Sequence, residues 1–410
     1  MSHSSARARC VVCVASYFKG VEFMRECHRQ GARVFLITRE KMLDEDWPRE
    51  SLEDILALPD DASEDLFRHA VVHLAQRHPV DRLVALEEFD VLATAGAREH
   101  LQLMGTTTSA ARLFRDKLAM RLRADACRIR VPDFVHVLNH EAIAEFMNRV
   151  PPPWVLKPRS DVNAVGIKKL ETQEEVWRAV EALDARESLT EQSSYFLLER
   201  YIPGEVFHVD SLSEGGAVVF DGASRYGRPP MDVAHKGGVF TSHTVEYDSK
   251  EHRELTQMNR KLLRGLGLEY GAAHAEFIRS AEDGSLYFLE VAARVGGAYI
   301  AETLEAATGI NLWREWARIE LAGGRRSEGE RTTPRRDYGG IALSLARQEA
   351  PDTSHYTESE IVYRIKKPHH VGLVVRSHEL ARVRQLLEEY TRRFSEDFLA
   401  VAPPPERVPR

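Results

Sequence analysis

Two glutamates in neighbouring strand-like runs are the strongest chemical signal in this chain of 410 residues. Glu276 lies in Ala272–Arg279 and Glu290 lies in Leu286–Ala292. Both runs are rich in strand-forming residues, and a turn cluster, Ala-Glu-Asp-Gly-Ser, separates them. The pattern predicts a β-hairpin with one carboxylate on each arm.

The turn sets the register of this hairpin. A three-residue loop with Gly284 in the left-handed position pairs Ala281 with Ser285. Counting back by twos then places Glu276 directly opposite Glu290. Like charges that face each other across a ladder destabilise it unless a cation lies between them. Two carboxylates on adjacent strands suit Mg²⁺, which binds one or two protein carboxylates together with phosphate oxygens and water. The alternative is an exposed hairpin whose glutamates are simply solvated.

The same register sorts the neighbouring side chains into two faces. The predicted core face carries Ala275, Phe277, Leu289 and Val291, and the carboxylate face carries His274, Ala292 and Arg294. An arginine beside a dicarboxylate site can hold phosphate or a substrate carboxylate, because its fork matches those groups.

Two lysines upstream are candidate phosphate ligands. Trp154–Lys157 reads as a short apolar strand that ends in a lysine and is followed by the loop Arg159–Gly166. Such a strand presents an ammonium group beside a loop, which is a plausible phosphate clamp. Phe114–Met120 places Lys117 at the start of a helix. A lysine at the end of an element is also commonly just solvated surface.

Composition excludes several classes of protein. Apolar residues make up 43% of the chain, charged residues 29%, and the formal net charge is −7. No basic excess points to nucleic acid, and no apolar run approaches the length of a membrane span. Cys10-x-x-Cys13 lies inside the apolar run CVVCVA and reads as a buried strand rather than a redox or zinc site. With no signal peptide evident, we expect a cytoplasmic protein.

The elements that position these residues begin with an alternating pattern. Strand, helix and strand patterns at 10–16, 20–30 and 32–38 predict a βαβ start and an open parallel sheet. No GxGxxG fingerprint follows the first strand, so a dinucleotide site is not indicated. Glu251–Leu266 is an amphipathic helix that packs and carries no chemistry. Strands near 340–346 and 372–375 and a helix over Glu379–Tyr390 follow the hairpin.

Taken together, four separated motifs resemble the ATP-grasp superfamily. They are the lysine-bearing helix, the lysine-tipped strand with its loop, the strand Glu-Arg-Tyr-Ile-Pro-Gly-Glu at 199–205, and the Glu…Glu-x-x-x-Arg hairpin. They agree in order and spacing over approximately residues 10–325. The resemblance is greatest to the carboxylate–amine ligase branch, which includes L-amino-acid (dipeptide) ligases and carnosine-synthase-like enzymes.

The resemblance implies roles for individual residues. Lys117 and Lys157 would hold the phosphates of ATP, beneath a loop that ends at Gly166. The adenine hinge would consist of Glu199, Arg200, Tyr201 and Ile202, and Glu205 would bind the ribose hydroxyls. Glu276 and Glu290 would ligate Mg²⁺, with Mn²⁺ as an alternative, and Arg294 would stabilise the transferred phosphoryl group or the substrate carboxylate. His208 and Asp210 would line the cleft or serve the structure.

The chain departs from the family pattern in two places. The loop from Arg159 to Gly166 has one glycine where the family usually has several, so we expect a stiffer loop. The hairpin often continues Glu-x-Asn, but this chain has Ala292 at the last of these positions. One metal ligand is therefore missing, and a second Mg²⁺ would depend on water and substrate oxygens.

The predicted fold class is α/β, becoming α+β in the catalytic part. An N-terminal open parallel-sheet domain (1–113) precedes a two-lobed ATP-grasp domain (114–325) with a lid at about 131–200. A small C-terminal α+β segment (326–410) ends in a disordered tail. Substrate choice is expected between the N-terminal sheet, the hairpin and the segment 221–243, where Asp221–Tyr226 and His235–Gly238 are candidates.

The implied reaction joins a small-molecule carboxylate to an amine through an acyl phosphate, with release of ADP and phosphate. An ATP-dependent carboxylase and a peptide-modifying ligase are alternative enzymes. A nucleotide-binding regulator without ligase activity is the alternative from a different class, and the single-glycine loop and Ala292 would be its signs. We expect neither nucleic-acid nor membrane partners, and a homodimer is compatible with the sequence.

Overall fold

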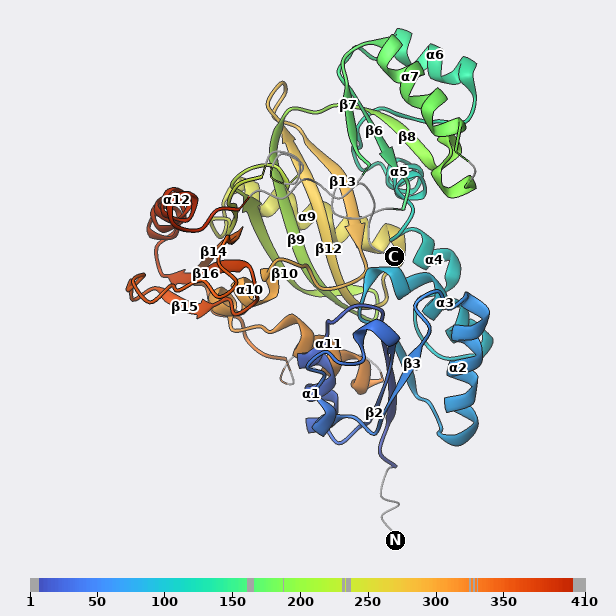
Figure 1. Cartoon of the computed structure of the whole chain (residues 1–410), viewed down its shortest axis with the longest axis vertical. Helices are drawn as coiled ribbons and strands as arrows, with labels where there is room; N and C mark the ends of the chain where they lie inside the picture. The colour runs from blue at the N-terminus through green and yellow to red at the C-terminus, as the bar shows by residue number, and fades with distance from the viewer. Residues whose placement is uncertain are drawn as a thin grey trace.

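The computed structural model describes residues 7–160, 166–186, 188–230, 233, 237–323, 326, 329 and 331–400. Within these ranges the chain forms two four-stranded sheets and one eight-stranded sheet. Figure 1 shows the N-terminal sheet at the bottom, the large sheet in the middle and the second small sheet at the upper right. The predicted α/β fold class, with an N-terminal parallel sheet, is confirmed. The predicted disordered tail falls outside the described residues.

The N-terminal sheet is parallel, with the strand order β3-β2-β1-β4. Its strands are β1 (Cys10–Ala15), β2 (Arg33–Arg39), β3 (Asp54–Leu58) and β4 (Arg82–Ala85). Helices α1 (Val21–Arg29), α2 (Glu64–Arg77) and α3 (Val91–His100) alternate with them. Every residue of β1 is buried, and burial raises the pKa of the Cys13 thiol. The CxxC run is therefore a core strand, as its apolar context predicts.

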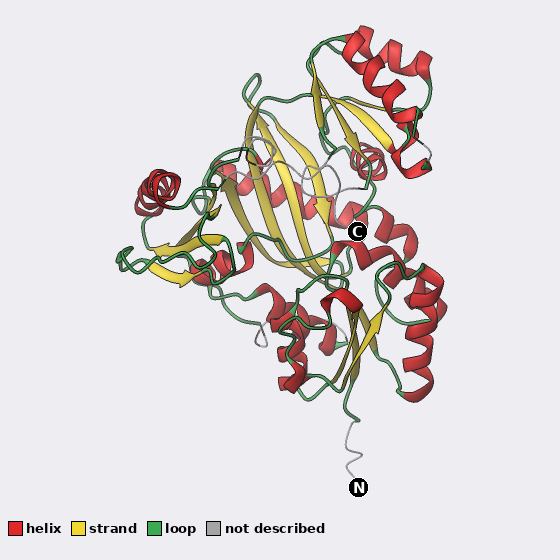
Figure 2. Cartoon of the chain, viewed as in Figure 1, coloured by secondary structure: helices red, strands yellow, loops and turns green. Residues whose placement is uncertain are grey.

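The second small sheet carries one of the two candidate lysines. Its order is β5-β8-β6-β7, formed by β5 (Phe134–His136), β6 (Trp154–Pro158), β7 (Lys168–Leu170) and β8 (Phe196–Arg200). Helices α6 (His140–Arg149) and α7 (Gln173–Asp184) pack their apolar faces on one side of it (Figure 2). Lys157 on β6 and Glu199 on β8 therefore belong to a unit with its own small core.

The large sheet has the order β13-β12-β9-β10-β11-β14-β16-β15, with every neighbouring pair antiparallel. Its strands are β9 (Gly204–Glu214), β10 (Ala217–Tyr226), β11 (Phe240–Thr244), β12 (Tyr270–Ser280), β13 (Leu286–Ala292), β14 (Tyr338–Leu345), β15 (Ile361–Arg364) and β16 (His370–Ser377). The strands of the predicted C-terminal α+β segment thus extend this sheet.

Helices cover both faces of the large sheet. The amphipathic helix α9 (Lys250–Leu266) packs its leucines on one face, as predicted. On the other face, α10 (Ile300–Thr308) and α11 (Leu312–Ala322) join a core that also includes α1. Helix α12 (Leu380–Asp397) packs against the C-terminal strands, and α4 (Thr108–Arg112) and α5 (Lys117–Ala126) lead into the lid. No helix of the described residues is long and apolar enough to cross a membrane.

The hairpin of β12 and β13 places Glu276 opposite Glu290, as predicted, but its turn differs. Ser280 N donates to Ser285 O at 2.9 Å, so the turn has four residues rather than three. A β-bulge then restores the pairing, because Phe277 faces Phe288 while Glu276 faces Glu290. The extra residue in the bulge is Leu289.

The bulge corrects one expectation about the core. Phe288, not Leu289, packs with Phe277, at a ring-centroid distance of 6.0 Å. Both phenylalanines are fully buried, with an exposed fraction of 0%. Leu289 instead faces a cavity on the opposite side of the sheet. The hairpin therefore presents an apolar side chain beside its two carboxylates.

A close approach of β9 to β12 makes Gly204 necessary. A Cβ atom at Gly204 would lie 2.0 Å from the carbonyl oxygen of Arg279. We expect Gly204→Ala to lower the free energy of unfolding by about 3 kcal/mol, because the strands must separate to admit the methyl group. Gly96→Ala, within α3 and with no atom in contact range, should raise it by up to ~1 kcal/mol. Urea unfolding of both variants measures these changes. Equal free energies of unfolding for the two variants would contradict the prediction.

Candidate active site

One cavity of about 480 Å³ lies where the second small sheet, the large sheet and the N-terminal domain meet. Most of the predicted site residues line it: Lys117, Lys157, Glu199, Arg200, Tyr201, Ile202, Glu276, Glu290 and Arg294. Residues 161–165 of the loop before Gly166 lie outside the described residues. Gly166 itself is exposed, with a φ of +74°, and it is not among the described residues of the lining.

The two hairpin carboxylates are each held by a partner. The Tyr226 hydroxyl donates to Glu276 Oε1 at 2.8 Å, and Lys117 Nζ lies 3.0 Å from Glu290 Oε2. Burial would raise the pKa of Glu290, but Lys117 and Lys157 outweigh it and lower that pKa well below its usual range. Glu290 is therefore a carboxylate at neutral pH.

This arrangement fits a divalent cation. No hydrogen bond from a described residue reaches Glu276 Oε2 or Glu290 Oε1, so each carboxylate retains one oxygen for a ligand. Mg²⁺ and Mn²⁺ prefer such oxygen ligands. Ala292 pairs with His274 and is buried beside the carboxylates, so it offers no third carboxylate or amide.

A buried triad fixes Lys157. Both oxygens of Glu199 are held, one by Arg121 Nε at 2.5 Å and the other by Lys157 Nζ at 2.5 Å. Burial and the nearby Arg121 lower the pKa of Lys157 to about 8, against the opposing effect of Glu199. Arg121 was not predicted, although its position four residues after Lys117 on α5 gave a helical-spacing signal. The Glu199 side chain thus orients Lys157. The other residues at the end of β8 can therefore face a ligand.

A second buried carboxylate, Glu88, holds the predicted arginine. Arg294 Nη2 donates to Glu88 Oε2 at 2.8 Å, and Arg115 Nη1 donates to Glu88 Oε1 at 2.5 Å. Burial would raise the pKa of Glu88, but the two arginines outweigh it and lower that pKa. Glu88 follows β4, 206 residues before Arg294, so no local pattern could have joined them.

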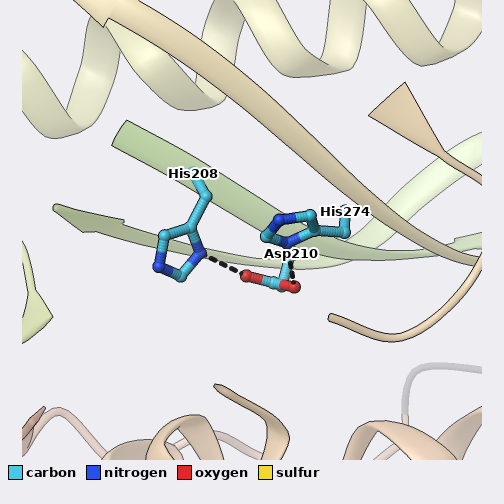
Figure 3. A group of neighbouring side chains, drawn as sticks. All are labelled: His208, Asp210 and His274. Carbon is cyan, nitrogen blue, oxygen red and sulfur yellow. Dashed lines mark hydrogen bonds and ion pairs between the residues drawn. The ribbon is translucent and has the colours of Figure 1, made fainter. Parts of the chain in front are cut away.

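His208 and Asp210 form a buried network with His274 (Figure 3). Asp210 Oδ2 accepts from His208 Nδ1 at 2.6 Å, and Asp210 Oδ1 accepts from His274 Nδ1 at 2.9 Å. His274 Nε2 then lies 3.5 Å from Glu276 Oε1. His274 and Asp210 face each other across β12 and β9, so the sheet register builds this chain of contacts toward Glu276.

The network is strongly charged. Burial would lower the pKa of His274, but Asp210 and Glu276 raise it to about 10. Burial would raise the pKa of Asp210, but His274 and His208 lower it well below its usual range. The imidazolium of His274 therefore supplies a positive charge beside Glu276, as Lys117 does beside Glu290.

The structure does not bring Glu205 to the cavity. Side chains alternate along β9, so Gly204 and Val206 line the cavity while Glu205 points to the opposite face. There Glu205 forms an ion pair with Arg225 and has a side chain that is 50% exposed. The residue on the cavity face at this point is Val206, whose apolar side chain cannot bind hydroxyl groups. Glu205 is thus a predicted nucleotide-binding residue that the structure places outside the cavity lining, and its ribose contact stays a prediction.

Comparisons with known proteins agree with this geometry. A family model described as an ATP-grasp domain matches residues 150–302, and one described as an ATP-grasp N-terminal domain matches residues 24–105. The fold and the site define an ATP-grasp protein. The chain belongs to the ATP-grasp superfamily, as its motifs suggested.

Individual relatives extend the comparison. The L-arginine-specific L-amino acid ligase of Bacillus subtilis is 24% identical over 272 residues, which cover 65% of this chain and 64% of that protein. The crystal structure of an L-amino acid ligase from Bacillus licheniformis has a TM-score of 0.74 at 18% identity, covering 97% of this chain and 99% of its own. A biotin carboxylase–βγ-ATP complex from Campylobacter jejuni has a TM-score of 0.71 at 14% identity, covering 96% and 92%.

The buried network around Asp210 should affect stability in a pH-dependent way. Asp210→Asn is expected to lower the free energy of unfolding by ~3–5 kcal/mol, because His274 loses its counter-charge in a buried site. The contribution of His274 is complete below its ordinary pKa of 6.5 and is lost as the pH rises through about 10. The contribution of Asp210 to the free energy of unfolding is complete above its ordinary pKa of 3.8 and is lost as the pH falls below that value.

The difference between wild type and Asp210→Asn should therefore be largest between pH 3.8 and pH 6.5 and should shrink toward pH 10. Urea unfolding at several pH values measures it. Asp65→Asn is the matched control, because Asp65 forms an ion pair with Arg68 while its side chain is 77% exposed. A difference that stays constant above pH 6.5 would refute the charged network.

Proposed function

We propose that the protein is an ATP-dependent carboxylate–amine ligase that acts on amino-acid-like small molecules. The observation that carries the proposal is the pairing of Glu276 with Glu290 in a cavity that also holds Lys117, Lys157 and Arg294. Two carboxylates for a metal and three cations for phosphates or a carboxylate are the parts that this phosphoryl transfer requires. The relatives named as L-amino acid ligases support the substrate class.

Different residues of the chain would bind different parts of ATP. Lys117 and Lys157 would hold the phosphates, and the end of β8 with the residues after it, Glu199 to Ile202, would surround the adenine. Glu276 and Glu290 would hold Mg²⁺ or Mn²⁺ through their unused oxygens. Such an ion, when bound, neutralises charge on the phosphate oxygens.

Arg294 would act on the acid. An oxygen of the substrate carboxylate attacks the γ-phosphorus, and the bond to ADP breaks to give an acyl phosphate. The amine nitrogen then attacks the acyl carbon, phosphate leaves, and one proton is released. Arg294 would neutralise negative charge at the reacting carboxylate or phosphoryl group. It now binds Glu88 at 2.8 Å, so the incoming anion must share or replace that contact.

Release of ADP over a panel of amino acids, singly and in pairs, tests this proposal. Turnover that needs both an acid and an amine supports a ligase. Tight ATP binding without turnover on any carboxylate would instead indicate a nucleotide-binding regulator, and bicarbonate-dependent release would indicate a carboxylase. A homodimer and a cytoplasmic location remain predictions from the sequence.

Lys157 should make ATP binding pH-dependent. A phosphate ligand favours the charged lysine, so affinity should be full below the pKa of about 8 and should fall as the pH rises through it. The loss should approach ~10-fold per pH unit above that pKa. Lys157→Arg stays charged and should remove the dependence. Titration of both proteins with ATP checks this, and an equal slope in the arginine variant would exclude Lys157 as its source.

Glu290→Ala should abolish metal-dependent turnover while leaving the chain folded. Removing one of two paired carboxylates takes away a metal ligand, and we expect ADP release to fall by ~10²–10³-fold or more. Glu269→Ala, at an exposed position just before β12, is the matched control and should keep full activity. Steady-state kinetics over a range of Mg²⁺ concentrations, with circular dichroism for folding, makes the measurement. Wild-type turnover in Glu290→Ala would remove Glu290 from the site.

A further inference from the structure

The cavity extends beyond the carboxylates toward an apolar end. It is lined by β13 and β12 at one side and by Tyr226 on β10 and Phe240 on β11 at the other. Neighbouring strands lie roughly 4.8 Å apart, so Phe240 is on a strand roughly 14 Å from that of Glu276. Pro229, Pro230 and Ile300 complete this end. The cavity therefore has room beside the metal carboxylates for a second group.

Tyr226 lies between the carboxylate end and the apolar end of the cavity. Its hydroxyl reaches Glu276 Oε1 at 2.8 Å, so its ring lies between that carboxylate and Phe240. The rings of Tyr226 and Phe240 meet edge to face, with centroids 5.6 Å apart. A side chain attached to an acid held beside Glu276 would lie on the Tyr226 ring and point toward Phe240.

The charged residues of the described cavity lining lie at the carboxylate end of the cavity or at the border of its apolar end. Lys157 is paired with Glu199, Lys117 with Glu290, and Glu88 with Arg294. Arg200 forms an ion pair with Glu282, and His274 is held by Asp210. Among the described residues, none on β10, β11 or α10 offers this end a carboxylate for a guanidinium or an ammonium group.

We propose that the apolar end, lined by Tyr226, Phe240, Pro229, Pro230 and Ile300, selects an acyl donor that is an α-amino acid with a large apolar side chain. This inference rests on the proposed function for the role of the acid, but the pocket itself can be tested by binding alone. Removing a leucine or phenylalanine side chain from water is the source of the preference. A basic side chain would lose hydration there, and the carboxylate that borders this end, Glu276, is the one proposed to hold the metal.

Calorimetric titration of the full chain, saturated with MgADP, tests the pocket without turnover. L-leucine and L-phenylalanine should bind ~10–100-fold more tightly than L-alanine and L-arginine. Phe240→Ala should reduce the ratio of leucine to alanine affinity by ~10-fold while leaving the alanine affinity unchanged. Phe220→Ala is the matched control, because Phe220 is on β10 outside the described lining.

The outcomes separate this inference from the proposed function. Arginine binding as tight as leucine, no preference among the four amino acids, or an equal loss for all four in Phe240→Ala would overturn the apolar pocket. ADP release from amino-acid pairs without an apolar preference would leave the ligase proposal standing. An apolar preference in binding without ADP release would support the pocket and refute the ligase.

Discussion

The site depends on holding several buried and half-buried carboxylates close together despite their mutual repulsion. Glu276 and Glu290 share one rung of the ladder, where like charges destabilise the pairing. Each carboxylate has its own partners that offset this repulsion. Glu276 contacts Tyr226 and the imidazolium of His274, and Glu290 contacts Lys117. Tyr226 on β10, Lys117 on α5 and Asp210 on β9, which holds His274, all lie outside the hairpin and support its register, so the site and the fold stabilise each other.

The ion pairs of the site also determine how a ligand can bind. Lys117 and Arg294 bind protein carboxylates at 3.0 Å and 2.8 Å, and these are the cations that a nucleotide or an acid would need. A charge buried without a partner costs several kcal/mol, so a free site must keep its cations paired. Under the proposed function, phosphate and metal together would exchange for these contacts, because a metal at Glu290 would take the place of Lys117 and phosphate would take the place of Glu290 at Lys117. Binding of both components should therefore be coupled.

Local pattern was enough to predict the hairpin, the βαβ start and the helix beginning at Lys117, because each depends on neighbours in sequence. The rung of Glu276 and Glu290 was also predicted, but through a turn that is one residue too short and a strand without its bulge at Leu289. The two errors cancelled. Glu88 and Arg121 could not be assigned their partners from sequence, since contacts over 206 and 78 residues depend on how whole units pack. Side-chain alternation along β9 turns Glu205 away from the cavity, which the motif spacing alone does not indicate.

The C-terminal strands explain why the far end of the cavity can be apolar. If the sheet ended at β11, Phe240 would lie on an edge strand with unpaired backbone groups open to water. Instead Phe240 pairs with Leu343 of β14, and β16 and β15 continue the sheet. Helix α10 also packs closely against β14, since a Cβ added at Gly339 would lie only 2.6 Å from the carbonyl oxygen of Thr303. The C-terminal α+β segment therefore turns a sheet edge into an interior wall, which an apolar side-chain pocket requires.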